Sequence, residues 1–422
     1  MAHNWGRQVF VLFLSTRIYF QKGNLAIYRQ PRPPTVYPAI GATSVKRGLF
    51  VAKAYYFLFF GAIGCLAPFL NIFFQQKGLT GAQIGLLSSI PPLVALTANP
   101  IWGTIADRWQ IHRLVLALCA LVAGMITLFF LRVEEFIVFV LLVTILTFFR
   151  TPIGAIVDST VMDMVKQGNV AYGHQRLWGT IGFVLVSFGL GQLVTADNLS
   201  PVFWLHTVLL GIGCVILGFM LPVQSIDQPV GIKQGIRVLL AQRNYVSLLI
   251  AVSFLGMGVA GYVGFMGLQV VALGGTAQQV GLAWAINAIL ELPLMYFGAK
   301  WFARVSNRRL ILTAIFLFMI VWALLGLSTT PTQMIFIVLG NGVCFGIYWV
   351  AAVGYASYAA PPGLSATAQA LMGAGFSGLG WSLGSVVAGN LWDIFGGHMV
   401  FFFSASMAML ALLIFWLGSK EG

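Results

Sequence analysis

Apolar runs of about 20 residues recur along almost the whole chain, and this feature limits the possible folds more than any other. A run of that length crosses a hydrocarbon core roughly 30 Å thick as an α-helix. Charged residues make up only 8% of the 422 positions, whereas about 25% is usual for a soluble domain. We therefore expect an all-α membrane protein whose surroundings are the lipid bilayer.

Twelve such runs form two groups of six. The first group is expected at residues 49–74, 84–106, 114–131, 136–161, 177–194 and 202–221. The second group is expected at residues 246–273, 280–302, 310–327, 334–358, 371–391 and 399–416. We predict two six-helix bundles, residues 48–221 and 245–418, with a cytoplasmic linker at 222–244 and a short tail at 419–422.

The first 47 residues are basic and are interrupted by prolines. They hold seven Lys and Arg residues, no acidic residue, and a P-R-P-P break at Pro31 to Pro34. The apolar run from Val9 to Leu14 is short for the core of a secretory signal peptide. We predict a disordered tail at residues 1–47. An organelle transit peptide and a start codon assigned too far upstream stay open as alternatives.

The formal net charge of +13 does not point to a nucleic-acid partner, because the basic residues lie between the apolar runs. Lys and Arg are retained in short cytoplasmic loops of membrane proteins. Alternate loops hold most of them: Arg108, Arg113, Lys166, Arg176, Lys233, Arg237, Arg243, Lys300, Arg304, Arg308 and Arg309. The other loops hold little beyond Lys77 and Arg132. We predict cytoplasmic termini in a bacterial inner membrane, with an organelle membrane as the alternative.

The two groups of runs resemble each other in sequence. G-T-I-A-D-R-W-Q-I-H-R-L-V-L follows the second run from Gly103, and G-A-K-W-F-A-R-V-S-N-R-R-L-I-L follows the eighth from Gly298, 195 positions later. Q-R-L-W-G-T-I-G-F at Gln175 and Q-A-L-M-G-A-G-F at Gln369 are 194 positions apart. Two matches at one period indicate a duplicated six-helix unit, the parallel repeat of carriers whose solute site lies between the halves.

The segment at Gly103 resembles the loop signature of major facilitator carriers, G-x-x-x-D-R-x-G-R. Here G-x-x-A-D-R is followed by His112 and Arg113, and the glycine after the arginine is absent. The resemblance covers residue 48 to the C-terminus. It implies the major facilitator fold, with twelve transmembrane helices in two six-helix pseudo-repeats.

A narrower resemblance rests on Y-G-H-Q-R-L-W-G-T-I-G-F from Tyr172, D-S at Asp158 and E-L-P at Glu291. Together these segments are similar to the branch that includes phenylpropionate permeases and the nucleoside and oligosaccharide proton symporters. The resemblance implies uptake of a small-molecule solute by alternating access, with the proton as coupling ion and no other cofactor.

Four ionisable residues inside predicted spans are candidates for the transport chemistry, because a charge near the bilayer centre costs roughly 2.5 to 3.5 kcal/mol. They are Lys53, Arg150, Asp158 and Glu291. Glu291 shares a helix face with Asn287, four positions earlier. Because desolvation disfavours a charged carboxyl, we expect Glu291 to exchange a proton or to contact the solute, with a structural ion pair as the alternative.

Arg150 keeps its charge, and we expect it either to hold a solute carboxylate or to neutralise Glu291 or Asp158. For Asp158, the expected role is a gate-like ion pair with Arg176 across the next loop, with proton transfer and contact with water as alternatives. Lys53 lies near the cytoplasmic start of its span, so its side chain is expected to extend toward water.

Two further groups of residues are candidates. The resemblance at the loop predicts a cytoplasmic gate in which the aspartate receives a charge-assisted bond, with a solvated turn as the alternative. This gate comprises Gly103, Asp107, Arg108 and Arg113, to which we add Arg176. The tenth run carries polar and aromatic residues that either line the solute path or pack helices together. These are Asn341, Tyr348 and Trp349.

Enzyme functions are not supported by the motifs. G-F-S-G at Gly375 and G-W-S-L-G at Gly380 match serine-nucleophile strings, but a nucleophile elbow needs a strand-to-helix turn that an apolar helix denies. The sequence has no H-E-x-x-H motif, and its four cysteines lie within apolar runs without paired spacing. We expect no metal site. An intramembrane protease and a receptor without transport are remote alternatives.

The sequence therefore predicts a monomeric proton symporter for a small organic solute that binds between the two bundles. Arg150 favours an aromatic or other organic acid, because a guanidinium suits a carboxylate. Sugars and nucleosides are the alternatives.

Overall fold

The computed structural model describes residues 42–168, 170, 172–195, 198–222, 232–302, 304–361 and 364–419. Within these residues the secondary structure is almost entirely helical. Residues 45–422 form one compact unit, and of the first 44 residues only 42–44 are described. The predicted disorder of the tail therefore falls largely outside the described residues.

Twelve helices among the described residues are long and apolar enough to cross a membrane. The first six are α2 (Ala42–Gln76), α3 (Gly81–Trp109), α4 (His112–Ile126) continued by η1 (Thr127–Arg132), α5 (Phe136–Gly168), α6 (Tyr172–Leu193), and α7 (Ser200–His206) continued by η2 (Thr207–Cys214) and α8 (Val215–Met220). The second six are α10 (Arg243–Ala272), α11 (Ala277–Trp301), α12 (Asn307–Leu327), α13 (Pro331–Ala359), α14 (Ser365–Gly373) continued by η3 (Ala374–Gly380) and α15 (Trp381–Phe395), and α16 (Gly397–Gly418). The predicted fold class is confirmed.

The internal repeat is visible in the way equivalent helices begin. Thr80 precedes α3 and accepts a bond from the backbone N–H of Gln83, while the Gln83 side chain bonds back to Thr80. Thr276 and Gln279 form the same capping box at the start of α11, 196 positions later. Each box satisfies N–H groups that the first turn of a helix leaves free.

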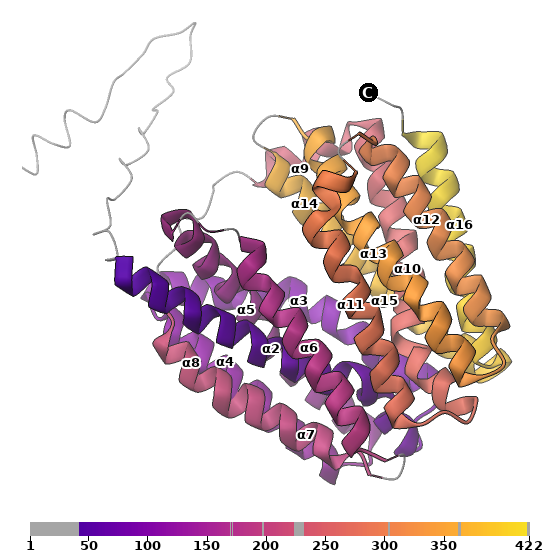
Figure 1. Cartoon of the computed structure of the whole chain (residues 1–422), viewed down its shortest axis with the longest axis horizontal. Helices are drawn as coiled ribbons and strands as arrows, with labels where there is room; N and C mark the ends of the chain where they lie inside the picture. Colours follow the sequence, from indigo (N-terminus) through magenta and orange to yellow (C-terminus); the bar gives the residue numbers. More distant parts are fainter. Residues whose placement is uncertain are drawn as a thin grey trace, which may run out of the picture. The chain divides into compact units, whose positions relative to one another are not determined.

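Helices α2–α8 form the first half and α10–α16 the second half of the unit (Figure 1). In the first half α3 and α4 pack against α5, and in the second α10 and α12 pack against α16. Among the described residues, the halves pack together most extensively at two crossings, α3 with α15 and α6 with α11. We call the end with residues 77–80, 273–276 and 396 the loop-77 end. The end with residues 110–111, 304–306 and 360–361 is the loop-110 end.

Two predicted boundaries differ from the structure. The first transmembrane helix begins at Ala42, inside the stretch expected to be tail, because a helix can continue past the apolar slab into polar residues such as Lys46. The expected linker at 222–244 contains a short helix, α9 (Ile232–Leu240). Its Leu239 is buried against Tyr245 and Ala368, so apolar packing holds this part of the linker in place.

Candidate functional site

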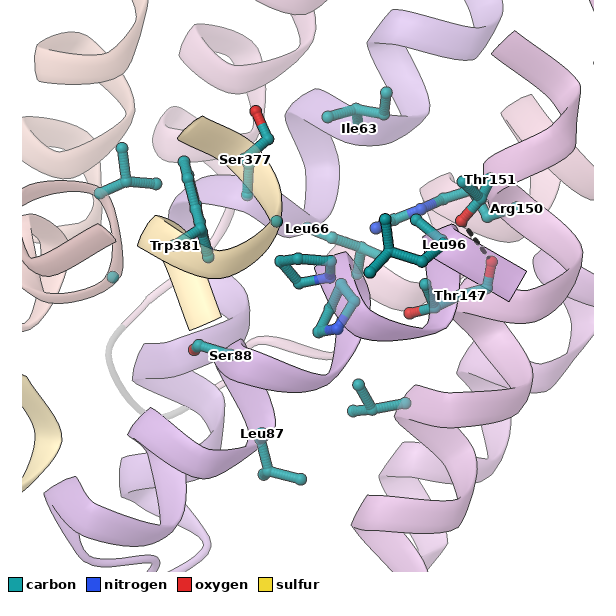
Figure 2. Close-up of a pocket in the computed structure, with 18 of the residues that line it drawn as sticks. Ile63, Leu66, Leu87, Ser88, Leu96, Thr147, Arg150, Thr151, Ser377 and Trp381 are labelled. Atoms are coloured by element: carbon teal, nitrogen blue, oxygen red, sulfur yellow. Dashed lines mark hydrogen bonds between the residues drawn. The ribbon is translucent and has the colours of Figure 1, made fainter. Parts of the chain in front are cut away.

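A cavity of about 620 Å³ lies between the two halves. Its walls come from α2, α3 and α5 of the first half and from α10, α14, η3 and α15 of the second. Figure 2 shows Ser377 and Trp381 on one side of this space and Thr147, Arg150 and Thr151 on the other. The cavity is therefore built jointly by the two repeats, as expected for a solute site between them.

Most of the wall is apolar, with Leu66, Leu70 and Leu96 among its side chains and with the rings of Pro91 and Pro92. Polar side chains are few: Asn71, Ser88, Asn99, Thr147, Arg150, Thr151, Ser377 and Trp381. None of the described wall residues carries a carboxylate. Such a surface suits a partly apolar solute with a small number of polar groups.

Arg150 is the one charged side chain among the described residues of the wall. It extends from α5 into the cavity beside Leu66 and Leu96 (Figure 2). In the described part of the chain its guanidinium makes no hydrogen bond and no ion pair. The structure therefore contradicts the alternative in which Glu291 or Asp158 neutralises Arg150. The cavity offers a fixed positive charge with free donors.

The wall is closed toward the loop-77 end. The amide Nδ2 of Asn71 donates to the backbone oxygen of Gly264 over 2.8 Å, a bond between α2 and α10. The hydroxyl of Ser382 on α15 donates to the backbone oxygen of Ser89 on α3 over 3.1 Å. Both bonds join the two halves along the wall, and Asn71 and Gly264 are themselves wall residues.

Exposure of the lining residues shows where the cavity opens. Phe74 and Leu87, toward the loop-77 end, are each 1% exposed. Leu96, farther along α3 toward the loop-110 end, is 51% exposed, and Asn99 and Ala370 are exposed as well. The cavity is accessible from the loop-110 end.

Asp158 does not pair with Arg176, although that ion pair was expected. Its carboxylate accepts hydrogen bonds from the hydroxyls of Tyr56, at 2.6 Å, and Tyr172, at 2.9 Å. The Arg176 guanidinium instead lies over the ring of Phe60, 3.6 Å from its centroid. Two tyrosine donors satisfy the carboxylate, and the aromatic face attracts the cation, so neither group requires the other.

Asn287 and Asn341 bond to each other and do not line the cavity. The Asn341 amide donates to Asn287 over 2.9 Å, and Trp322 donates its indole N–H to Asn341 over 3.0 Å. Glu291 lies on α11, half-buried, and is also absent from the wall. The amide pair satisfies itself inside the second half, which is why these residues are not presented to the cavity.

The aromatic residues expected to line the solute path pack within the second half. Tyr348 is 1% exposed, and its ring lies against Phe318 and Phe376. Trp349 stacks on Phe345 with ring centroids 5.8 Å apart. Both give helix packing rather than a cavity surface in this structure. Lys53, on α2, is half-buried and also lies outside the wall.

At the predicted gate motif, the partner of Asp107 is a histidine. His112 Nε2 lies 2.8 Å from Asp107 Oδ1, and the His112 side chain is buried. Arg108 and Arg113 are exposed, and Gly103 is half-buried. Gln110 stands where the family signature has glycine and adopts φ 53°, in the left-handed region. That backbone conformation explains the glycine of the signature.

The sequence reasoning missed most polar groups of the wall, including Asn71, Ser88 and Asn99. One signal was available, because Pro91 and Pro92 interrupt the hydrogen bonding of α3 where the cavity begins. No cluster of three or more His, Cys, Asp or Glu side chains that suits a metal ion occurs among the described residues.

Residues 49–403 match the MFS_1 like family. The chain belongs to this family of transporters. This MFS_1 like protein is 30% identical to the maltose permease of Geobacillus stearothermophilus, over 88% of its own length and 95% of the relative. It is 28% identical to the probable 3-phenylpropionic acid transporter of Escherichia coli (strain K12), over 85% of this chain and 95% of that protein.

Solved structures give the same fold. The crystal structure of the nucleoside transporter NupG covers 89% of this MFS_1 like chain and 100% of its own, with a TM-score of 0.76 and 17% identity. The predicted major facilitator resemblance is confirmed. The protein is therefore an integral, multi-pass membrane transporter and not an enzyme.

Proposed function

We propose that this transporter is a proton-coupled symporter for a small, partly apolar organic acid that binds in the cavity between the two halves. The observation that carries the proposal is Arg150, a guanidinium without a partner among the described residues, in a wall without a carboxylate. A half-buried cation without a counter-charge loses part of its hydration, and a solute carboxylate would supply the missing charge.

The rest of the cavity fits the remainder of such a solute. Arg150 can bind both oxygens of one carboxylate through paired N–H donors. Facing it across the cavity are Ser377 and the ring of Trp381, with apolar side chains between (Figure 2). A ring or a short aliphatic body would lie against these surfaces. The similarity to the probable 3-phenylpropionic acid transporter points to the same solute class.

For the proton, Glu291 is the carboxyl that we propose to exchange it. The residue lies on α11, at the crossing with α6, and the charge of Arg176 on α6 acts on it. Protonation would remove that attraction between the halves, so proton occupancy and the relative position of α6 and α11 would be linked. Asp158 is the weaker candidate, because its carboxylate already accepts hydrogen bonds from two tyrosine hydroxyls within the first half.

The orientation that we propose places the loop-110 end in the cytoplasm of a bacterial cell. Exposed Arg108, Arg113 and Arg304 lie at that end, as cytoplasmic loops retain basic residues. The bacterial relatives agree with such a membrane. Under this orientation the cavity faces the cytoplasm, both ends of the described chain are cytoplasmic, and the loop-77 end is outside.

A sugar is the second candidate solute. The observation in its favour is the 30% identity with the maltose permease over most of both chains. Asn71, Ser88 and Asn99 in the wall could bond hydroxyl groups, and Trp381 could stack on a sugar ring. A sugar would leave the charge of Arg150 without a counter-ion, which is why we rank it second.

Uptake by purified protein in liposomes tests the proposal. A pH gradient, acidic outside, is imposed, and accumulation of 3-phenylpropionate is compared with accumulation of its amide, of maltose and of uridine. The protonated acid also crosses lipid unaided, so uptake is taken as the rate above that of protein-free liposomes. We expect this added uptake for the carboxylate alone, and its loss when a protonophore collapses the gradient. Accumulation of maltose or uridine in place of the carboxylate would reject the organic acid, and carboxylate uptake that ignores the gradient would reject proton coupling.

A further inference from the structure

Asp393, near the C-terminal end of α15, bonds to the N-terminus of α3 in the other half. One carboxylate oxygen accepts from the backbone N–H of Gly81 over 2.6 Å, and the other accepts from that of Ala82 over 2.8 Å. The two residues joined in this way are more than 300 positions apart in sequence. Among the described hydrogen bonds between the halves, these are the ones that involve a carboxylate.

Glycine makes the close approach possible. A Cβ on Gly81 would lie 2.7 Å from the Asp393 carboxylate and from the backbone oxygen of Gly389. A Cβ on Gly85 would collide with the backbone of Ser385. With any larger residue at these positions, α3 and α15 would move apart and the carboxylate would lose the two N–H groups.

The position of Asp393 is unfavourable for its own helix. A negative charge in the last turn of a helix is repelled by the negative end of the helix dipole, whereas the N-terminus of a helix attracts it. Asp393 lies in the last turn of α15 and on the first turn of α3. Its favourable interactions therefore come from the other half, which indicates a role in holding the halves together rather than in stabilising α15.

The local cap of α3 does not replace this contact. Thr80 accepts from the N–H of Gln83 and leaves the amides of Gly81 and Ala82 to Asp393. When α3 and α15 separate, Thr80 stays with α3 and Asp393 leaves with α15. The two amides and the carboxylate then turn to water, and charge-assisted bonds are lost.

We propose that Asp393 holds the loop-77 end closed while the cavity is open at the loop-110 end, and that its release from α3 is required before the cavity opens at the loop-77 end. The proposal rests on the alternating access of the proposed function but not on the identity of the solute or on proton coupling. Asp393 is a positioning residue, since it lies outside the cavity wall.

Solute-free labelling of a cavity cysteine tests this role. The four native cysteines, all buried, are replaced by alanine, and Ala67, an exposed wall residue, becomes the reporter Ala67→Cys. A membrane-impermeant maleimide is added to sealed vesicles on the side that carries the loop-77 face. A separate Lys77→Cys protein, labelled in the same way, shows which side that is. Labelling rates are compared in the parent, Asp393→Ala, Asp393→Asn and Thr80→Ala proteins.

We expect Asp393→Ala to raise the labelling rate from the loop-77 face about tenfold, because two charge-assisted bonds no longer favour closure. Asp393→Asn keeps the shape of the side chain but removes the charge, so it should give a smaller rise and serves if the alanine variant fails to fold. Thr80→Ala, which weakens the same helix end without touching the contact between halves, should leave the rate unchanged.

Equal labelling of the parent and both folded Asp393 variants would overturn the proposal. An equal rise in Thr80→Ala and Asp393→Ala would also overturn it, because fraying of α3 would then explain the effect. Since no solute is present, failure here leaves the proposed transport function intact, and loss of transport with the expected labelling pattern would reject the solute assignment instead.

Discussion

The two crossings between the halves are built differently. At the crossing of α6 with α11, contact runs along both helices, from the close approach of Gly191 and Gly281 near the loop-77 end to His174 and Tyr296 at the loop-110 end. At the crossing of α3 with α15, contact continues from Gly81 to Ser89. Beyond that point, residues of α3 and of η3 form part of the cavity wall.

Local sequence accounts for this difference. Pro91, Pro92 and Pro100 interrupt α3, and η3, opposite them, is a π-helical segment. Each proline removes a backbone hydrogen bond, and π-helical turns often mark functional sites in helices. Helix α6 has no proline, and its glycines and small residues let it pack on α11 throughout. The cavity thus forms where the helices are irregular.

The largest effect is expected in the cavity beside the α3–α15 crossing, from Arg150 on α5. Arg150→Gln should lower the kcat/KM for uptake of the organic acid about 100-fold, because the charge-assisted bonds to the carboxylate are lost. Arg150→Lys should recover part of the activity, since a point charge remains without the paired donors. Initial rates of uptake in liposomes measure both. Arg132→Gln, an exposed variant at the end of η1, is the control, and unchanged uptake in Arg150→Gln would remove the main reason for an anionic solute.

At the crossing of α6 with α11, Glu291→Gln should abolish accumulation of solute against a gradient, while downhill exchange of solute continues. The glutamine cannot exchange a proton, but it preserves the size of the side chain on α11. Accumulation and counterflow in the same liposomes separate the two activities. Full accumulation in this variant would show that Glu291 is structural and that another group couples the proton.

The next prediction compares two asparagine variants, one expected to lower the stability of the protein and one expected to weaken solute binding. Asn341→Ala leaves Trp322 and Asn287 short of partners, so it should destabilise the protein by about 1 to 3 kcal/mol and lower the thermal midpoint. Asn99→Ala, at the open wall, should leave the midpoint unchanged and alter only the apparent affinity for solute. Thermal unfolding in detergent and uptake kinetics distinguish the two, and a reversed pattern would assign the solute site to the second half.

The smallest effect is expected at the loop-110 end of the crossing of α6 with α11. Tyr296→Phe removes the hydroxyl that lies 2.6 Å from His174 Nε2 but keeps the ring that stacks on the imidazole. One exposed hydrogen bond contributes about 0.5 to 1.5 kcal/mol, so the uptake rate should change no more than about tenfold. A complete loss of uptake would mean that the contact between His174 and Tyr296 controls access to the cavity. The crossing of α6 with α11, rather than that of α3 with α15, would then be the one that matters most for transport.

The fold was predictable because its cause is local. Runs of apolar residues long enough to cross a bilayer appear in the sequence itself, and the matching segments at Gly103 and Gly298 reveal the repeat. Arg150 was also predictable as a candidate, since a charge inside a membrane span is expensive and rare. These inferences required no knowledge of which helices are neighbours.

The rest of the site depends on neighbours that sequence spacing does not give. Asn71 and Asn341 look alike in sequence, yet one lines the cavity and the other bonds to Asn287 across 54 positions. Nothing in the local sequence marks Asp393, because its contact with Gly81 joins residues 312 positions apart. The sequence predicts a charge-assisted bond to Asp107 without naming the donor, and loop geometry brings His112 to the carboxylate.

A structure with bound solute tests the central claim most directly, and a bromine-substituted aromatic carboxylate would mark its position in the density. We predict the carboxylate within about 3 Å of the Arg150 guanidinium and the ring between the two halves, toward Trp381. A solute bound inside one half, or bound in the cavity with its carboxylate turned away from Arg150, would contradict the account.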